Sequence, residues 1–134
     1  IRLIVRGMLS LIPEMKDFSA NIRAISIVDR FLEHSRFMIF CNGGDEIVYI
    51  TSADIMPRNL DRRIEILFPI SDPGMKKAIL ENILSVHLRD NTKAWELGPD
   101  GCYHRVAPRE GEETVHSQQW FLGHRGCWQS YDGE

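Results

Sequence analysis

Residues 36 to 51 read Arg36-Phe-Met-Ile-Phe-Cys-Asn-Gly-Gly-Asp-Glu-Ile-Val-Tyr-Ile-Thr51, which is two apolar runs around a short polar turn. Asparagine, aspartate and glycine readily adopt the positive φ that tight turns between strands require. The flanking runs are rich in β-branched and aromatic residues, which favour extended backbone. This stretch therefore predicts a β-hairpin, with one strand on each side of residues 42 to 45.

Five further segments read as strands. They are Arg2 to Arg6, Ile22 to Val28, Ile64 to Ile70, Lys93 to Leu97 and Cys102 to Val106. The end of the second segment could instead turn helical. The third is almost continuously apolar, which is typical of a central strand covered on both faces. The last two flank Gly-Pro-Asp-Gly at 98 to 101, a turn sequence that predicts a second hairpin.

Two segments have the pattern of helices. Asp72 is a suitable N-cap and Pro73 suits the first helical position, so we expect a helix from there to about Asp90. Its apolar residues recur at helical spacing and form a broad buried stripe. Ser117 to Leu122 is expected to be a short helix. Together these elements predict an α/β fold in which a mixed β-sheet is flanked by helices.

Length and composition indicate one globular domain. The chain has 134 residues, of which 43% are hydrophobic and 26% charged, and its formal net charge is −3. These values exclude a disordered chain and give no basic field, so we expect no nucleic-acid partner. No signal peptide or membrane-spanning run is visible. Because Ile1 to Gly7 reads as a strand from its first residue, we expect residues 1–134 to be a single domain excised from a longer chain, with an irregular tail after about residue 123.

The cysteines are sparse. Cys41, Cys102 and Cys127 are odd in number and include no Cys-x-x-Cys pair, so we expect no disulfide framework and a cytoplasmic protein. Cys102, His104, His124 and Cys127 could offer two sulfurs and two imidazoles to a zinc ion. Their spacing and their turn chemistry are not typical of a zinc site, so ordinary surface and core roles are the preferred interpretation. The sequence leaves the question open.

Arginine dominates the basic residues of the first half of the chain. Between Arg6 and Glu65, every basic residue except Lys16 is an arginine. The planar guanidinium can grip two phosphate oxygens at once, which an ammonium cannot. Acidic residues are equally frequent in this region, however, so a surface of ion pairs explains the charge alone better than a phosphate site does.

The positions of the polar residues favour a site. Most of them flank predicted strands, where ligands of open α/β sheets collect. The candidates are Arg6, His34, Arg36, Ser52, Asp54, Arg58, Arg63 and Glu65. Apart from Arg6, they lie around the start of the strand at residue 36, the end of the strand at residue 51 and the start of the strand at residue 64. If these three strands are neighbours, their loops meet at one end of the sheet. Such a cluster suits phosphoryl transfer, since cations stabilise the transferred group and an imidazole exchanges a proton. The alternative for His34 is a histidine that caps a strand or lies beneath a loop.

Three motifs resemble one known family. They are Ser26-Ile-Val-Asp-Arg-Phe-Leu-Glu-His-Ser-Arg36, Asn42-Gly-Gly44 and Ser52-Ala-Asp-Ile-Met-Pro-Arg-Asn-Leu-Asp-Arg-Arg-Ile-Glu65. They are similar to the C-terminal region of bacterial polyphosphate kinases of the histidine-phosphorylating type. Leu3 to Gly7 and Asp90 to Ala94 resemble the same family, so the likeness extends over about residues 1 to 118. It implies one half of a phospholipase D-like fold, the C-terminal catalytic lobe of the enzyme.

The resemblance also implies an activity and roles. Polyphosphate kinases reversibly transfer the terminal phosphate of ATP to polyphosphate through a phosphohistidine, and that histidine would lie in a preceding lobe that is absent here. Arg6 and His34 match positions that line the nucleotide phosphates, with His34 as a second, catalytic histidine. Arg63 matches a basic residue of the polyphosphate tunnel. The second-rank candidates are Arg36, Ser52, Asp54, Arg58 and Glu65.

Cofactor and partners follow from the same resemblance. Mg²⁺ is expected in the full enzyme, with ligands outside this chain. The expected partners are ATP or ADP, polyphosphate, the preceding lobes and a further copy of the enzyme, in the cytoplasm or at its membrane. Since the family's site is shared between two lobes, this chain alone should bind weakly and turn over little.

Two other functions remain open. His34-Ser-Arg36 with Ser52, Asp54 and Glu65 also resembles half of a phospholipase D site, which would make the protein a phosphodiesterase. There the motif is His-x-Lys, and Arg36 in place of lysine argues for the kinase because the two cations differ in geometry. The second alternative is a non-catalytic module that binds polyanions through its arginines.

Overall fold

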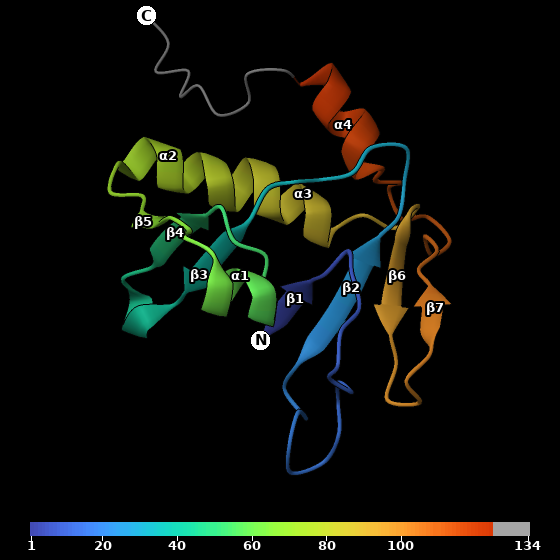
Figure 1. Cartoon of the computed structure of the whole chain (residues 1–134). Coiled ribbons are helices and arrows are strands. Elements are labelled where there is room, and N and C mark those ends of the chain that lie inside the picture. Colours follow the sequence, from blue (N-terminus) through green and yellow to red (C-terminus); the bar gives the residue numbers. More distant parts are fainter. Residues whose placement is uncertain (125–134) are drawn as a thin grey trace, which may run out of the picture. The chain divides into compact units, whose positions relative to one another are not determined.

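The computed structural model describes residues 1–124, and the chain divides into two compact units. Unit 1 consists of residues 1–33 together with the described residues from 81 onward, and unit 2 consists of residues 34–80. Figure 1 shows the strands and helices of each unit. Each unit is described by itself below.

Unit 1 contains a four-stranded mixed sheet with the order β1-β2-β6-β7. These strands are β1 (Arg2–Ile4), β2 (Arg23–Ile27), β6 (Ala94–Leu97) and β7 (Tyr103–Arg105). β1 runs parallel to β2, whereas β2–β6 and β6–β7 are antiparallel. The predicted hairpin around residues 98 to 101 is thereby confirmed. Side chains of β2 alternate in burial, and Ala24 is only 1% exposed. The alternation is that of a sheet with one covered face.

A buried carboxylate organises the helical part of unit 1, which includes α3 (Ser85–Leu88) and α4 (Ser117–Gly123). Asp90 is 3% exposed. Its Oδ2 accepts hydrogen bonds from the amide (2.9 Å) and hydroxyl (2.6 Å) of Ser117 at the start of α4. Its Oδ1 accepts from the amides of Thr92 (3.0 Å) and Lys93 (2.7 Å). Burial raises the pKa of Asp90, but these hydrogen bonds outweigh it and hold the pKa below its usual value.

Unit 2 contains a three-stranded antiparallel sheet with the order β3-β4-β5. The strands are β3 (Phe37–Phe40), β4 (Ile47–Thr51) and β5 (Leu67–Pro69). The hairpin predicted for residues 36 to 51 is confirmed, since Phe40 pairs with Ile47 across the turn that contains η1 (Asn42–Gly44). Asn42, Gly43 and Gly44 all have positive φ, as the composition of this turn predicts.

The first α-helix of unit 2 is α1 (Pro57–Arg62). Further along, α2 (Pro73–Lys77) leads into the π-helical η2 (Ala78–Leu84), and α3 follows directly. The predicted N-cap is confirmed, because the Asp72 carboxylate accepts a hydrogen bond from the amide of Met75 at 2.7 Å. Helical backbone extends to Leu88, close to the predicted end, and the boundary between the two units falls within η2.

The predicted fold class is confirmed, with three differences in detail. The strands form two sheets instead of one. Residues 57–62, for which no helix was predicted, form α1, because Pro57 suits a first helical position. The prediction of a central strand from Ile64 to Ile70 was wrong: within residues 1–124, β5 pairs with β4 alone and its three residues are exposed. Ile64 is 102% exposed, so apolar character did not imply burial here.

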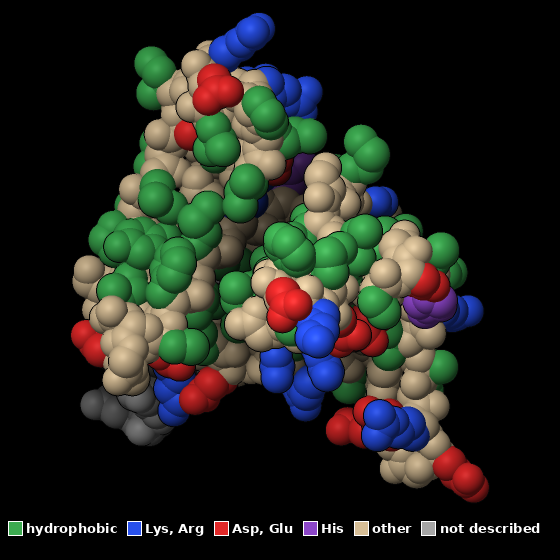
Figure 2. Space-filling view, turned by 90° about the horizontal axis from the view of Figure 1, so that it is seen from below, with side chains coloured by type: hydrophobic (Ala, Val, Ile, Leu, Met, Phe, Trp, Pro, Cys, Tyr) green, Lys and Arg blue, Asp and Glu red, His purple; other side chains and the backbone are tan. Residues whose placement is uncertain are grey.

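Large hydrophobic side chains lie on the surface of both units. Figure 2 shows such side chains gathered over several parts of the face in view. Those of unit 2 that are more than half exposed are Phe40, Ile55, Leu60, Ile64, Ile66, Leu67 and Met75. No helix within residues 1–124 combines the length and the apolar character needed to cross a bilayer.

Replacing Asp90 should destabilise unit 1 in a pH-dependent way. In Asp90→Asn, loss of the charge-assisted bonds should lower the free energy of unfolding at pH 7 by about 1.5–3 kcal/mol. The pKa of Asp90 is lower in the folded state than its unfolded-state value of about 3.9. Its carboxylate therefore stabilises the fold fully at a pH above the unfolded-state pKa, and this stabilisation is lost as the pH falls through the folded-state pKa. The difference between the two proteins should therefore shrink below about pH 4. Urea unfolding between pH 7 and pH 3 measures this.

Asp61→Asn is the matched control, since Asp61 is exposed on α1. It should leave the urea midpoint nearly unchanged at every pH. An Asp90→Asn defect that stays constant down to pH 3 would show that the carboxylate charge is not what stabilises the start of α4.

Candidate functional site

Three loops meet at one end of the sheet of unit 2. β3 begins at Phe37, β4 ends at Thr51 and β5 begins at Leu67. Antiparallel pairing places Phe37 opposite Ile50 and Thr51 opposite Leu67, so the residues just outside all three strands lie at the same end. Backbone hydrogen bonds extend the pairing, from the amide of Thr51 to the carbonyl of Arg36 (3.1 Å) and from that of Ser52 to the carbonyl of Ile66 (3.0 Å). The expectation that these strands are neighbours is confirmed.

The loop before β3 is tied to the loop after β4 by an ion pair. Nε of Arg36 donates to Oδ1 of Asp54 at 2.7 Å, and Nη1 of the same guanidinium donates to the His34 carbonyl at 2.9 Å. The Arg36 side chain is 28% exposed and that of Asp54 is 48% exposed. His34 itself is exposed, so it is not a histidine buried beneath a loop.

A second contact ties the loop after β4 to the loop before β5. The Ser52 hydroxyl donates to Oε2 of Glu65 at 2.5 Å and accepts from the amide of Ile66 at 3.0 Å. Ser52 and Glu65 therefore satisfy each other, and their first role in this structure is to hold two loops together. The sequence placed them in the cluster, but local pattern could not show this bond.

Opposite charges lie close together in this cluster. The hydrogen bond from Arg36 is the main cause that lowers the pKa of Asp54, and the charges of Arg58 and His34 lower it further, whereas slight desolvation opposes them. The same hydrogen bond raises the pKa of Arg36, assisted by the charges of Asp54 and Glu65. The cluster is therefore a network of paired charges, as the ion-pair interpretation of the sequence anticipated.

α1 supports this end of the sheet. Asn59 is 3% exposed, and Nδ2 of its side chain donates a hydrogen bond to the backbone carbonyl of Asp54 at 3.2 Å. Arg58 lies on the same helix, one residue earlier. Arg63 caps the C-terminal end of α1 with extended backbone and is exposed, two residues before Glu65. Six of the predicted residues thus flank one end of the sheet, and Arg63 lies in the segment that joins α1 to β5.

Arg6 belongs to the other unit. It follows β1 by two residues and is exposed. Since β1 is parallel to β2, Arg6 leaves the sheet of unit 1 at the same end as the segment that follows β2. Its association with the loops of unit 2 stays a prediction.

The segment between β2 and His34 carries contacts that the sequence analysis missed. Gln118 forms two hydrogen bonds with the backbone of Phe31: its Oε1 accepts from the Phe31 amide at 2.9 Å and its Nε2 donates to the carbonyl at 2.6 Å. The Asp29 carboxylate hydrogen bonds to His116 and lies 3.9 Å from Nζ of Lys93. Burial raises the pKa of Asp29, but the hydrogen bonds from His116 and from the backbone of Arg30, together with the charges of His116 and Lys93, lower it overall. These partners are 87 residues apart in sequence, so no local signal reveals them.

The possible zinc ligands do not form a described cluster. Within residues 1–124 no group of three or more His, Cys, Asp or Glu side chains is placed to hold a metal ion. His104 pairs with Asp100 at 3.0 Å, and the ring of His124 stacks on Trp120 at 4.1 Å. Cys127, the fourth ligand of the zinc hypothesis, lies outside the described residues.

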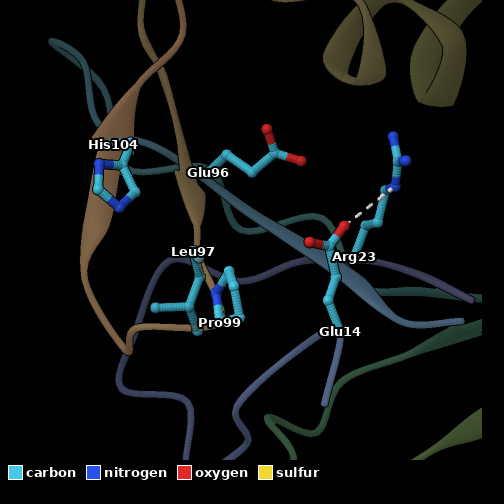
Figure 3. A pocket seen from close by; sticks show the side chains of 7 residues that line it. Glu14, Arg23, Glu96, Leu97, Pro99 and His104 are labelled. Carbon is cyan, nitrogen blue, oxygen red and sulfur yellow. Dashed lines mark ion pairs between the residues drawn. The ribbon is translucent and has the colours of Figure 1, made fainter. Parts of the chain in front are cut away.

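Unit 1 has a shallow hollow of about 270 Å³, shown in Figure 3. Glu14 and Arg23 form an ion pair at 3.5 Å on one side of it, and Glu96, Leu97 and His104 contribute from the β6–β7 hairpin. None of the predicted site residues lines it. This hollow is therefore not where the candidate chemistry is.

The arrangement in unit 2 can stabilise negative charge and exchange protons. An exposed imidazole can act as a general acid or base, and Arg58 and Arg63 are exposed guanidiniums in the adjoining helix and loop. Fixed cations of this kind are what phosphoryl transfer requires, because its transition state spreads charge over several oxygens.

A family model and two relatives that match this chain share one name. A family model described as "Polyphosphate kinase C-terminal domain 2" matches residues 1–118. The polyphosphate kinase of Rhodopirellula baltica is 49% identical over 119 residues, 89% of this chain and 14% of that protein. Polyphosphate kinase 1 of Chlorobaculum tepidum is 49% identical over 125 residues, 93% of this chain and 18% of that protein.

A solved structure agrees with these sequence matches. The crystal structure of polyphosphate kinase from Porphyromonas gingivalis aligns with a TM-score of 0.82 and 41% identity, and covers 91% of this chain and 19% of that chain. This chain thus spans 14–19% of the length of these three proteins.

Removing the Ser52 hydroxyl should loosen the start of β5. In Ser52→Ala the amide of Ile66 loses its acceptor and Glu65 loses its donor, so the free energy of local opening there should fall by about 0.5–1.5 kcal/mol. Native-state hydrogen exchange of the Ile66 amide measures it. The Ile70 amide, bonded to the Val48 carbonyl at 2.8 Å, serves as an internal reference, and Ser71→Ala is the matched control. Unchanged protection of Ile66 would contradict the bond.

Proposed function

Because this chain belongs to the family of polyphosphate kinase C-terminal domains, we propose that it supplies one side of a site that transfers the terminal phosphate of ATP to polyphosphate. The observation that carries the proposal is the convergence of three loops of unit 2, which brings His34, Arg36 and Asp54 together. The exposed imidazole of His34 is the group in this cluster suited to proton exchange with a substrate.

The proposed reaction has two steps. In the first, the bond between the γ-phosphorus of ATP and its bridging oxygen breaks, and a bond forms to a histidine nitrogen of a preceding lobe. His34 supplies a proton or a hydrogen bond to the departing oxygen of ADP. In the second, a terminal oxygen of polyphosphate attacks the phosphorus and the bond to nitrogen breaks. The reverse direction uses the same groups in reverse order, by microscopic reversibility.

The arginines would hold the phosphates in this proposal. The family resemblance assigns Arg6 and His34 to the nucleotide phosphates and Arg63 to the polymer. Arg58, beside them on α1, adds a guanidinium whose charge already acts on Asp54. A chain of phosphates has a charge at every unit, so several fixed forks bind it better than one. This division of roles rests on the family positions of the residues.

The side chains in the described part of this chain do not form a site that fits Mg²⁺. Within the described part of the chain no group of three or more carboxylates, imidazoles or thiolates gathers around a possible ion. The two carboxylates of the cluster are held by Arg36 and Ser52. We therefore assign no step to Mg²⁺, and we propose that its ligands belong to other parts of the enzyme.

The rest of the site would come from the remainder of a longer enzyme. The relatives are several times longer than this chain, which covers 14% and 18% of two of them. The chain alone should therefore bind polyphosphate weakly and form no polymer. Homo-oligomer formation and a place in the cytoplasm or at its membrane remain part of the proposal.

Replacing His34 tests the proposal directly. In the full-length enzyme that contains this chain, His34→Ala should abolish synthesis of polyphosphate from ATP while leaving the fold intact, because the nearby carboxylates of Asp54 and Glu65 are held by Arg36 and Ser52 and His34 carries the proposed proton transfer. Polymer formation is measured with labelled ATP, and circular dichroism checks the fold. His104→Ala, an exposed histidine of β7, is the matched control and should keep the wild-type rate. A His34→Ala enzyme with a normal rate would remove this residue from the mechanism.

Replacing Arg6 tests whether unit 1 contributes to the proposed site. Arg6→Ala in the full-length enzyme should lower kcat/KM by an amount equivalent to about 2–4 kcal/mol of transition-state stabilisation, typical of one fixed donor. Arg2→Ala, on the exposed side of β1, is the control and should change kcat/KM little. Steady-state kinetics with varied ATP give both values. Turnover of Arg6→Ala near the wild-type level would place Arg6 outside the site.

A further inference from the structure

The guanidinium of Arg36 is used by protein groups on two sides. Nε donates to Asp54 and Nη1 donates to the carbonyl of His34, at 2.7 Å and 2.9 Å. The donors of a guanidinium lie in one plane at fixed angles, so two such bonds determine the orientation of the whole group. Arg36 therefore fixes the backbone of His34 relative to the loop that follows β4.

The acceptor at the far side is itself anchored. The carbonyl of Asp54 accepts from the amide of Met56 at 2.8 Å and from the side chain of Asn59 at 3.2 Å, and Asn59 is buried. Arg36 is in turn anchored through its carbonyl, which accepts from the amide of Thr51 at 3.1 Å. A continuous set of bonds thus leads from α1 through Asp54 and Arg36 to the backbone of His34.

The charge of Arg36 is balanced within the protein. Its partner carboxylate is ionised and 2.7 Å away, and the charge of Glu65 also acts on it. A cation already neutralised by two carboxylates attracts a phosphate less than a free one does. A lysine at this position would keep the charge, but its single ammonium on a flexible stem could not hold both acceptors in the same geometry.

We propose that Arg36 and Asp54 are positioning residues for His34, and that Arg36 acts through its two-sided hydrogen bonding and not as a phosphate-binding cation. This inference rests on the proposed phosphoryl transfer at His34. It changes the expected role of Arg36 from a candidate ligand of phosphate to a support for the imidazole that meets the substrate.

The test is Arg36→Lys in the full-length enzyme that contains this chain. Because the charge is kept and the orientation is lost, kcat should fall roughly 10–100-fold, the usual consequence of a small misplacement of a reacting group. KM for ATP and for polyphosphate should stay within about twofold of the wild-type values, since binding does not use this cation. Arg62→Lys, an exposed arginine on the same α1 that supports Asp54, is the matched control and should leave kcat and KM unchanged.

Asp54→Ala is the second variant and does not depend on the stability of the first. It removes the acceptor of the hydrogen bond from Arg36 Nε without altering Arg36, so it should show the same fall in kcat with little change in KM. The double variant should be no slower than the slower single variant, because both changes break one connection. A thermal unfolding scan verifies that each protein is folded.

Two results would overturn the inference. A normal kcat in Arg36→Lys would show that its two-sided hydrogen bonding does not position His34, and a loss that appears mainly in KM would make Arg36 a phosphate-binding cation. Losses that multiply in the double variant would show that the two residues act separately. If instead the wild-type enzyme forms no polyphosphate from ATP, or if His34→Ala keeps its rate, the proposed function itself fails. The His34 variant thus distinguishes failure of the proposed function from failure of the positioning role.

Discussion

Antiparallel pairing of β4 with both of its neighbours determines which residues of unit 2 can meet. A strand that is antiparallel to both neighbours has its own end beside the beginnings of theirs. The residues just outside the sheet at that end are therefore 34 to 36, 52 to 54 and 63 to 66. They come from three separate parts of the chain, and backbone hydrogen bonds alone bring them together. The ion pair and the serine–glutamate bond then fix the spacing that the sheet has already set.

The charges of this cluster explain why composition gave so little indication of a site. The chain has a net charge of −3, because its 16 lysines and arginines are outnumbered by 19 aspartates and glutamates. In the structure the pairing is real at Arg36 and Asp54, yet Arg58 and Arg63 remain exposed beside it. The two interpretations of the sequence, ion pairs and a phosphate site, are therefore compatible. Some arginines organise the loops, and others are free to face a ligand.

Local pattern was sufficient for elements whose signals lie within a few residues. The hairpin from 36 to 51, the N-cap at Asp72 and the turn at 98 to 101 each depend on turn or cap chemistry that is written in consecutive residues. The neighbour relation of β3 and β4 follows from the predicted hairpin, whereas the place of β5 beside β4 was a condition of the predicted cluster that the structure meets. The candidate residues near that sheet end could be named in advance for the same reason.

Long-range relations could not be read from the chain in this way. Division into two sheets depends on which strands pair, and the Phe31–Gln118 and Asp90–Ser117 bonds join residues far apart in sequence. The exposed run from Ile64 shows a second limit. Hydrophobic periodicity reports that a surface prefers to be covered, but not which part of a protein covers it. Whether Arg6 meets His34 is a question of the same kind.

The short strand β5 has a consequence for self-association. A free strand border with apolar side chains is a ready template on which a foreign peptide can add by β-augmentation, the route by which many fragments precipitate. Here the border is only Leu67–Pro69, and its last residue has no N–H to donate. The ring nitrogen of Pro69 thus interrupts the row of donors where a further strand would have to continue. The apolar side chains of this strand edge are therefore combined with a backbone that offers one hydrogen-bond donor fewer to an added strand.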